Sequence, residues 1–552
     1  MKSLAACLIA LGLWFTPWPA FTAGVADLRE DSAAYRMRMC ELVLWSGESP
    51  LRDGMLDLNA GADVPYGAFA PAATAFALAR LLPAEAIHIE NGVLDEDALA
   101  RGARRLLLVQ SWIAAAALCF AGARLARGAG ESALPGRSRF TLALVAAAAW
   151  SAVALWPHSE VGSVSAAPWG LMLCPIVLAG AAWLRRPRDL GDQIGVAIGL
   201  GFLAGLALAN DPFAWPTLIA PLVALGLVAR QEQSPAPRNA LRTAIFFVAT
   251  TLIVSMLRTP WPVSATPWPE LGFLPSSAGL RLQELSLDVA CVALIAWLLF
   301  VAPAHTGRGV LAVVLVLCFA LRTIDTRFEL APMAPAGVAA VWCAQWLWFE
   351  GERRLARRVL LLCSAAGLAI ALGFGARDVR GSASTHVLRE LRQATAPSGA
   401  WNHPMARQQY AILANPRAAG SIVFHARRPV VGGLLPGAQI SDSARQAAAV
   451  LLAETTESMA QRAIELGAGY VVVERRDLEH IAKLRELAGR RPDDQESAGS
   501  ALRQMLTENV AEGFVLLRRV PNAVADDGPA ELAVWRTKLR VPERGVPTMG
   551  AR

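Results

Sequence analysis

Residues 193–210 read QIGVAIGLGFLAGLALAN, a run without a single charged side chain. A hydrocarbon core about 30 Å thick is crossed by about 20 mostly apolar helical residues, so this run is long enough to span a membrane. Further long apolar runs lie near 3–23, 104–126, 139–156, 168–185, 213–229, 241–257, 286–304, 309–322, 331–349 and 358–375. Because the runs are continuous and lack period-2 alternation, they predict helices and exclude a transmembrane barrel.

Arginine residues orient these spans, because basic residues near the ends of spans stay in the cytoplasm. They gather in alternate connections, namely Arg127 and Arg137, then Arg185, Arg186 and Arg188, then Arg230, Arg238 and Arg242, and finally Arg353, Arg354, Arg357 and Arg358. The connection 157–167 has no Lys or Arg, and the segment 27–103 carries 13 Asp and Glu against 6 Arg. We therefore expect these two segments, and the tail of the chain, to lie outside.

These features predict a polytopic α-helical membrane protein with about 11 to 13 transmembrane helices. The first domain, 1–375, holds the spans, a first outside loop at 27–103 and a further outside loop at 258–285. The second domain, 376–552, is the outside tail. The alanine- and arginine-rich composition and the lack of organelle signals favour a bacterial inner membrane, with the tail in the periplasm.

The tail alternates two kinds of segment. Runs at 421–424 and 470–473 have the β-branched and aromatic residues typical of strands, and 443–466 has a helical pattern. The tail therefore reads as a small mixed α/β domain.

At the other end of the chain, Lys2 and the small residues after the run 3–23 also fit a cleavable signal peptide. The tail would lie outside whether or not the first run is cleaved.

Composition excludes several classes of function. The net charge of +7 comes largely from the arginines that set topology, so no nucleic-acid-binding module is implied. Seven of the eight cysteines lie in apolar runs and only Cys40 lies in an outside loop, which leaves no disulfide framework for the tail. The sequence has no P-loop, zinc-spaced Cys/His set or nucleophile elbow, which argues against an ATPase or a metallopeptidase.

The most specific local text follows the first run and reads Asp31-Ser-Ala-Ala-Tyr35-Arg36-Met-Arg38-Met. A carboxylate on a short helix, with arginines about one turn along, can hold a divalent ion while the cations meet phosphate. This is the chemistry of a lipid phosphate at a membrane surface. The alternative is that Asp31 caps an interfacial helix while Arg36 and Arg38 extend toward lipid headgroups.

Three further stretches complete a pattern. Pro65-Tyr66-Gly67 follows the Asp31 segment, Thr323-Ile-Asp325-Thr-Arg327-Phe328 precedes the run at 331–349, and Gly420-Ser-Ile-Val-Phe-His425-Ala-Arg-Arg428-Pro429-Val-Val-Gly-Gly433 lies in the tail. In this order the chain resembles the catalytic subunit of oligosaccharyltransferase and its single-subunit bacterial relatives, which have the GT-C glycosyltransferase fold. The resemblance covers nearly the whole chain.

The resemblance implies roles for particular residues. Asp31 would bind a divalent cation, Mn²⁺ or Mg²⁺, and help to orient the acceptor. Arg327 would contact the lipid pyrophosphate or the acceptor, together with Arg36 and Arg38 on the donor phosphate. Where the family has a second acidic metal motif this chain reads Gly162-Ser163-Val164-Ser165-Ala166-Ala167, so Glu160 is the nearest substitute ligand.

Two more candidates follow from position alone. Glu270 stands where the family has a catalytic-loop glutamate, and His425 is a candidate substrate-binding residue in the stretch that resembles the start of the periplasmic domain. A solvated loop glutamate is the alternative for Glu160, and a packed histidine is the alternative for His425. Transfer of a sugar from a lipid phosphate needs charge neutralisation at the leaving group more than a nucleophile on the enzyme.

The sequence thus predicts a membrane glycosyltransferase that takes sugar from a polyprenyl-(pyro)phosphate donor. The acceptor would be a periplasmic protein or glycan, reached beside membrane lipid. The alternative is a noncatalytic relative of the same fold that binds lipid-linked glycan or a partner enzyme. A transporter is disfavoured because ionisable residues are nearly absent from the apolar runs.

Overall fold

A computed structural model of the chain describes residues 34, 37–38, 40–42, 44, 52–53, 55–56, 62–63, 96–125, 143–144, 146–147, 150, 166–184, 189–210, 214–231, 236–256, 278–302, 306–324, 328, 331–349, 383–394, 411–433, 440–479, 481–490, 499–521 and 529–538. These residues divide into two compact units. The first unit is helical and runs from α6 to α15. The second unit combines the described residues before position 64 with those after position 380.

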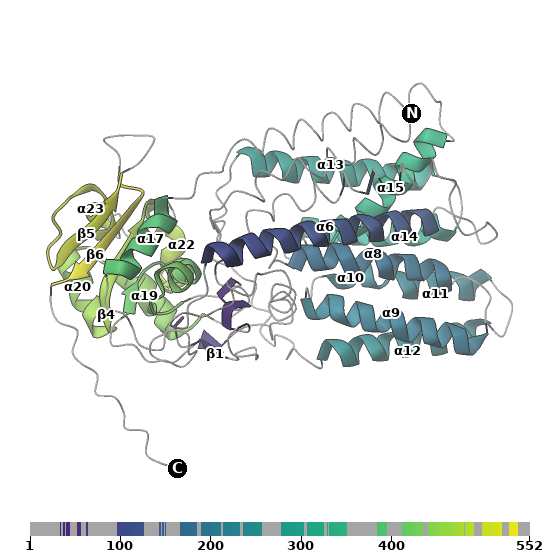
Figure 1. The fold of residues 1–552 in the computed structure, drawn as a ribbon, viewed down its shortest axis with the longest axis horizontal. Helices are drawn as coiled ribbons and strands as arrows, with labels where there is room; N and C mark the ends of the chain where they lie inside the picture. Colours follow the sequence, from purple (N-terminus) through teal and green to yellow (C-terminus); the bar gives the residue numbers. More distant parts are fainter. Residues whose placement is uncertain are drawn as a thin grey trace, which may run out of the picture. The chain divides into compact units, whose positions relative to one another are not determined.

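The first unit consists of helices, most of them long, that run alongside one another (Figure 1). They are α6 (Glu96–Leu125), α8 (Ala166–Leu184), α9 (Leu190–Asn210), α10 (Trp215–Leu218), α11 (Ala220–Gln231), α12 (Ala236–Met256), α13 (Ala278–Phe300), α14 (Thr306–Ile324) and α15 (Met333–Phe349). Each apolar run predicted between 168 and 349 coincides with one of these helices, except the run at 213–229. That run is divided into the short α10 and the longer α11.

Two stretches of the described chain are long and apolar enough to cross a membrane, Leu190–Ala209 in α9 and Gly307–Ile324 in α14. Shorter apolar stretches lie at Trp112–Ala123, Trp169–Ala181, Trp215–Leu227 and Asp288–Val301. The predicted runs at 3–23 and 358–375 lie outside the described residues, as does most of 139–156. The total of about 11 to 13 crossings therefore stays a prediction.

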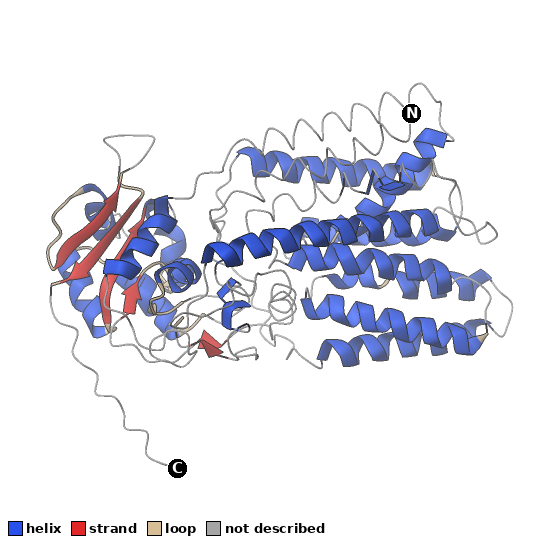
Figure 2. Ribbon diagram, viewed as in Figure 1, coloured by secondary structure: helices blue, strands red, loops and turns tan. Residues whose placement is uncertain are grey.

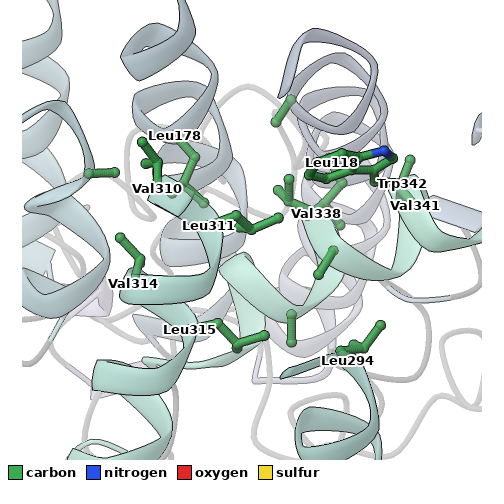
Figure 3. Packing of buried hydrophobic residues seen from close by; sticks show 14 of the residues in the cluster. Leu118, Leu178, Leu294, Val310, Leu311, Val314, Leu315, Val338, Val341 and Trp342 are labelled. Carbon is green, nitrogen blue, oxygen red and sulfur yellow. The ribbon is translucent and has the colours of Figure 1, made fainter. Parts of the chain in front are cut away.

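Apolar side chains from several helices meet in one core of the first unit (Figure 3). Leu118 of α6, Leu178 of α8, Leu294 of α13, Leu311 of α14 and Val338 of α15 all belong to this core. Elsewhere in the unit, small residues let two helices approach closely. A Cβ atom added at Gly201 of α9 would lie 2.7 Å from the Phe247 carbonyl oxygen of α12, as expected where helices pack through glycine.

The second unit is built on a four-stranded sheet with helices around it (Figure 2). Its strands are β3 (Ala411–Leu413), β4 (Ala468–Glu474), β5 (Phe514–Val520) and β6 (Leu532–Thr537), in the order β3-β4-β6-β5. Strand β3 is parallel to β4, and the other pairs are antiparallel. Its helices are α17 (Ala383–Ala394), α19 (Asp442–Leu451), α20 (Thr456–Glu465), α21 (Arg475–Glu479), α22 (Ile481–Leu487) and α23 (Ser500–Thr507). The mixed α/β architecture predicted for the tail is confirmed.

Both faces of the sheet are buried at β4 and β6, whose successive side chains point to opposite faces. Val471 and Trp535 belong to a core formed with helices that include α19 and α20. Val472 and Val534 belong to the opposite core, to which α17 contributes Leu388. The sheet is therefore the middle layer of this unit.

The strand predicted at 421–424 is wrong. The chain instead forms a 3-10 turn (η3, Pro416–Ala418), one turn of α-helix (α18, Ala419–Ser421) and a π-helical turn (η4, Ile422–Ala426). All five residues of η4 are buried. A short apolar run that is buried on every side has no polar face, so its periodicity does not separate helix from strand.

Residues from the predicted first outside loop also enter this unit. Leu42, Met55 and Leu56 are buried in the same core as Val472 of β4. Nearby, β1 (Arg52–Asp53) and β2 (Ala62–Asp63) form a short antiparallel pair. The division predicted from the sequence, 1–375 and 376–552, did not anticipate that the described part of this loop shares a core with the tail.

Candidate functional site

The residues predicted for the site fall into two groups. Asp31, Arg36, Glu160, Glu270 and Arg327 lie outside the described residues, so their roles stay predictions. Arg38 and His425 are described, and both side chains are 0% exposed in the second unit. A phosphate would therefore reach Arg38 only after the surrounding segment shifts.

His425 lies in η4, whose local sequence explains its irregular backbone. The side chain of Asn415 caps η3 by accepting a hydrogen bond from the Arg417 backbone N–H at 3.2 Å. At the other end, Arg427 adopts a left-handed conformation with φ of 55°, and Pro429 follows two residues later. A π-helical turn and a positive φ at a residue other than glycine are both uncommon, and both occur preferentially at functional sites.

The side chain of Arg427 is held from two directions. Its Nη1 donates to Oε2 of Glu41 in an ion pair, and its guanidinium lies 4.9 Å from the ring centroid of Phe424. The side chains of Arg427 and Glu41 are only 1% and 4% exposed. The two charges are therefore shielded from water and depend on each other, because a buried charge without a partner is costly.

Arg428 ties the same turn to a second element. Its Nη1 donates to the Arg427 carbonyl oxygen and its Nη2 donates to the Arg392 carbonyl oxygen, both at 2.9 Å. Arg392 lies in the last turn of α17, where exposed carbonyls attract cations. Two consecutive arginines thus connect η4 to the first-loop segment and to α17.

Backbone hydrogen bonds reinforce the contact with the first loop. The Val430 N–H donates to the Met55 carbonyl at 2.9 Å, and the Gly433 N–H donates to the Leu56 carbonyl at 2.6 Å. A Cβ atom at Gly433 would lie 2.6 Å from that same carbonyl oxygen, so the contact requires glycine. The described part of the first loop is therefore anchored to the tail, by way of Glu41, Met55 and Leu56.

His425 packs rather than facing solvent. Its ring meets Phe424 edge to face, with centroids 4.9 Å apart, and its side chain is fully buried. Contact with a substrate stays a prediction for this residue.

The sequence did not single out Glu41 and Arg427, the two residues of the buried ion pair. The only signal for them was an Arg-Arg pair inside an otherwise apolar stretch.

A buried carboxyl group lies where β3 and β4 end. Asp477 accepts hydrogen bonds from Asn415 Nδ2 at 2.8 Å and from the Glu474 backbone N–H at 2.9 Å. Burial raises the pKa of Asp477 to about 7, and the charge of Glu474 acts in the same direction. Because both oxygens of Asp477 are engaged, this carboxyl holds the two strand ends together.

Among the described residues there is no group of three or more His, Cys, Asp or Glu side chains that could hold a metal ion. The predicted ligands, Asp31 and Glu160, lie outside that part of the chain. The described residues therefore offer no cation site of their own, and the divalent cation stays a prediction.

In the first unit, the structure describes Phe328, the residue after the predicted site residue Arg327. Phe328, which follows Arg327 directly, is described and packs against the core of the first unit. The preceding helix, α14, is joined to α13 by an ion pair between Arg322 Nη2 and Asp288 Oδ1 at 3.3 Å. The Arg322 side chain is 10% exposed, so this cation is held largely inside the helical unit.

The fold of nearly the whole chain is similar to that of known proteins. No protein-family model matches the sequence, and no curated protein matches it. The fold is similar to that of the archaeal oligosaccharyltransferase AglB from Archaeoglobus fulgidus, in complex with an inhibitory peptide and a dolichol-phosphate. The TM-score is 0.63 at 13% identity, over 95% of this chain and 80% of the other. A structure of the Archaeoglobus fulgidus oligosaccharyltransferase with Zn and sulfate gives a TM-score of 0.60 at 13% sequence identity. The match covers 96% of this chain and 73% of the other.

A second kind of enzyme shows the same likeness. The arabinofuranosyltransferase AftD from Mycobacteria gives a TM-score of 0.50 at 14% identity, over 97% of this chain and 42% of that larger protein. At these identities the likeness shows the fold alone. The resemblance to the oligosaccharyltransferase fold that was predicted from the sequence is confirmed at that level.

Proposed function

We propose that this chain is a membrane glycosyltransferase that transfers sugar from a polyprenyl-(pyro)phosphate donor to a periplasmic protein or glycan. The single observation that supports this most is the extent of the fold likeness, which takes in 95% of this chain, helical unit and α/β unit together. One of those structures holds a dolichol-phosphate and another an acceptor peptide, which supports a lipid-linked donor here.

In this proposal the site residues divide by task. Asp31 and Glu160 would hold a divalent cation, Mn²⁺ or Mg²⁺, which would supply positive charge to neutralise the leaving phosphate. Arg36, Arg38 and Arg327 contact the donor phosphate, for which the buried side chain of Arg38 has to become accessible. Glu270 is assigned as a catalytic residue and His425 as a substrate-binding residue. Fixed cations stabilise the leaving group because they need no reorganisation as charge develops.

Localisation follows from the same proposal. The chain is placed in a bacterial inner membrane, with the second unit in the periplasm and the arginine-rich connections in the cytoplasm. The described second unit is a folded α/β body that includes first-loop residues, so the first loop and the tail are proposed to share the periplasmic side. Membrane lipid surrounds the helical unit.

The second candidate is a noncatalytic relative that binds lipid-linked glycan or a partner enzyme. One observation favours it, namely that the stretch 162–167 reads GSVSAA and contains no metal ligand. A noncatalytic relative would bind the lipid-linked donor through arginine side chains, and divalent cations would not change its affinity for the donor. It also predicts no sugar transfer under any condition.

The deciding assay is glycan transfer from a polyprenyl-linked donor by the purified full-length protein, with Mn²⁺, with Mg²⁺ and with EDTA. Asp31→Ala and Arg327→Ala should each reduce turnover by at least about 100-fold while leaving the melting temperature unchanged. Transfer that withstands both EDTA and Asp31→Ala would eliminate the metal-dependent route. Retained donor binding without any transfer would favour the noncatalytic relative.

A further inference from the structure

An ion pair joins two long helices of the first unit. Asp288 of α13 and Arg322 of α14 both fall within apolar runs that the sequence predicts to cross a membrane. Arg322 Nη2 lies 3.3 Å from Asp288 Oδ1. Ionisable residues are rare in such runs, and where they occur they usually mark a site or a path for a charged group.

The two partners of this ion pair differ in exposure. The side chain of Arg322 is 10% exposed, whereas that of Asp288 is 42% exposed. The Nη1 atom of Arg322 is buried and has no hydrogen-bond acceptor among the residues that the structure describes. A guanidinium binds a carboxylate or a phosphate best through two parallel N–H groups. Arg322 therefore keeps a buried donor that Asp288 leaves unused, and a buried donor without an acceptor is costly.

Another arginine of the same helix is fully engaged and provides a contrast. Arg308, near the start of α14, donates from Nη1 to the Ala302 carbonyl oxygen at 2.7 Å and from Nη2 to the Leu299 carbonyl oxygen. These carbonyls lie around the end of α13, where the helix dipole favours a cation. Both Nη atoms of Arg308 thus hold the connection between the two helices, whereas Arg322 has one Nη atom to spare.

Exposed apolar side chains lie close to the ion pair along both helices. Val289 and Val292 follow Asp288 by one and four positions, and they are 61% and 53% exposed. Ile324, two positions after Arg322, is 80% exposed. In a membrane, such side chains would contact lipid tails. A ligand that suits this combination carries a negative charge for the guanidinium and an apolar chain for its surroundings.

We propose that Arg322 binds the phosphate group of a lipid at this place on the helical unit, and that Asp288 occupies the guanidinium while no lipid phosphate is bound. The inference takes from the proposed function only the placement of the helical unit in a membrane. A phosphate accepts from two N–H groups of an arginine at once, and basic sites between membrane helices bind lipid head groups. Two sources supply this chemistry, a polyprenyl phosphate and an anionic phospholipid.

The test titrates the purified full-length protein in detergent with phosphatidylglycerol, with a polyprenyl phosphate and with inorganic phosphate. Arg322→Gln should weaken binding of the lipid phosphates by about 10-fold or more, because a hydrogen bond between charged groups is lost. Asp288→Asn should strengthen it by about 2- to 5-fold, because a partly exposed competing carboxylate is removed. Arg308→Gln is the matched control and should bind like the unmodified protein, since both Nη atoms of Arg308 already donate to carbonyls.

The Asp288→Asn variant separates this proposal from an ion pair that only stabilises the fold. If Asp288 merely held Arg322 in place, its loss would weaken lipid binding or leave it unchanged, and either result would overturn the proposal. A gain in affinity cannot come from misfolding. Equal losses in Arg308→Gln and Arg322→Gln would overturn the assignment to Arg322.

The three ligands distinguish the sources of the phosphate. Inorganic phosphate that binds as tightly as the lipids would overturn the lipid site. A preference for the polyprenyl phosphate would assign the site to the sugar donor, and equal or tighter binding of phosphatidylglycerol would assign it to membrane phospholipid. None of these measurements depends on sugar transfer, so a negative result here leaves the proposed function standing.

Discussion

The guanidinium of Arg427 and the carboxylate of Glu41 form a buried ion pair across a separation of 386 positions in the sequence. This contact joins the first-loop segment to the turn that contains His425. It does so through a backbone conformation, φ of 55°, that residues other than glycine seldom adopt. In this conformation the Arg427 side chain lies inside the unit, where its guanidinium contacts the Phe424 ring and pairs with the Glu41 carboxylate.

The first prediction concerns this ion pair. Glu41→Gln should destabilise the second unit by about 3–5 kcal/mol, because it leaves the Arg427 guanidinium buried without its counter-charge. Asp442→Asn is the control, since it makes the same chemical change in an exposed pair with Arg445, where the expected effect is below about 1 kcal/mol. Thermal unfolding of the two purified variants measures the difference. Equal melting temperatures would show that the buried pair contributes no more than an exposed one.

The second prediction concerns the close approach at Gly433. Gly433→Ala should destabilise the protein by about 1–3 kcal/mol, because its Cβ would meet the Leu56 carbonyl oxygen at 2.6 Å. Gly226→Ala in α11 is the control, because a Cβ there meets nothing within 4 Å and alanine favours a helix. Limited proteolysis of the first-loop segment gives a second readout. If Gly433→Ala leaves both the melting temperature and the cleavage rate unchanged, the anchoring contact is not as tight as described.

The third prediction concerns pH. Burial raises the pKa of Asp477 from 3.8 to about 7, so between these pH values the folded protein holds a proton that the unfolded chain has lost. The contribution of Asp477 to the free energy of unfolding therefore falls as pH rises from about 4 to about 7 and then levels off. Asp477→Asn removes this titration, so its melting temperature relative to the unmodified protein should rise between pH 5 and pH 8.

The control for the third prediction is Asp442→Asn, whose carboxyl is 90% exposed and whose relative melting temperature should stay constant over the same range. A constant difference for Asp477→Asn as well would mean that Asp477 is already ionised at pH 5 in the folded protein.

The fourth prediction concerns topology. Leu42 and Val472 belong to one core, so the first loop and the tail must lie on the same side of any membrane that the chain crosses. Reporter fusions should place 127–138 and 350–357 inside and 400–550 outside. An alkaline phosphatase fused near Ser500 and found inactive would contradict this arrangement, as would a cytoplasmic reporter that is active in the segment 27–103.

The sequence predicted two elements of different kinds correctly. The uncharged run at 193–210 corresponds to α9 (Leu190–Asn210), and the strand at 470–473 lies within β4 (Ala468–Glu474). The prediction failed at Ile422, Val423 and Phe424, where burial on every side removes the periodicity that separates helix from strand. Residue preferences alone favoured a strand there, and tertiary packing produced a helix.

The candidate site was less predictable for a different reason. Arg36 and Arg38 stand out by their spacing from Asp31, which is a local signal, and Arg327 stands out by the resemblance of its stretch to a known family. The pairing of Glu41 with Arg427 has no local signal, because nothing near either residue indicates a partner so far along the chain.

The core shared by Leu42, Met55 and Leu56 with the tail has a consequence for the order in which the protein is made. These early residues emerge from the ribosome long before Val430 and Val472, their neighbours in that core. At about 5–20 residues per second, synthesis of the intervening chain takes on the order of 20–80 s. Throughout that interval the early segment has no completed core, so its exposed apolar residues are a target for chaperones and proteases until the last strand arrives.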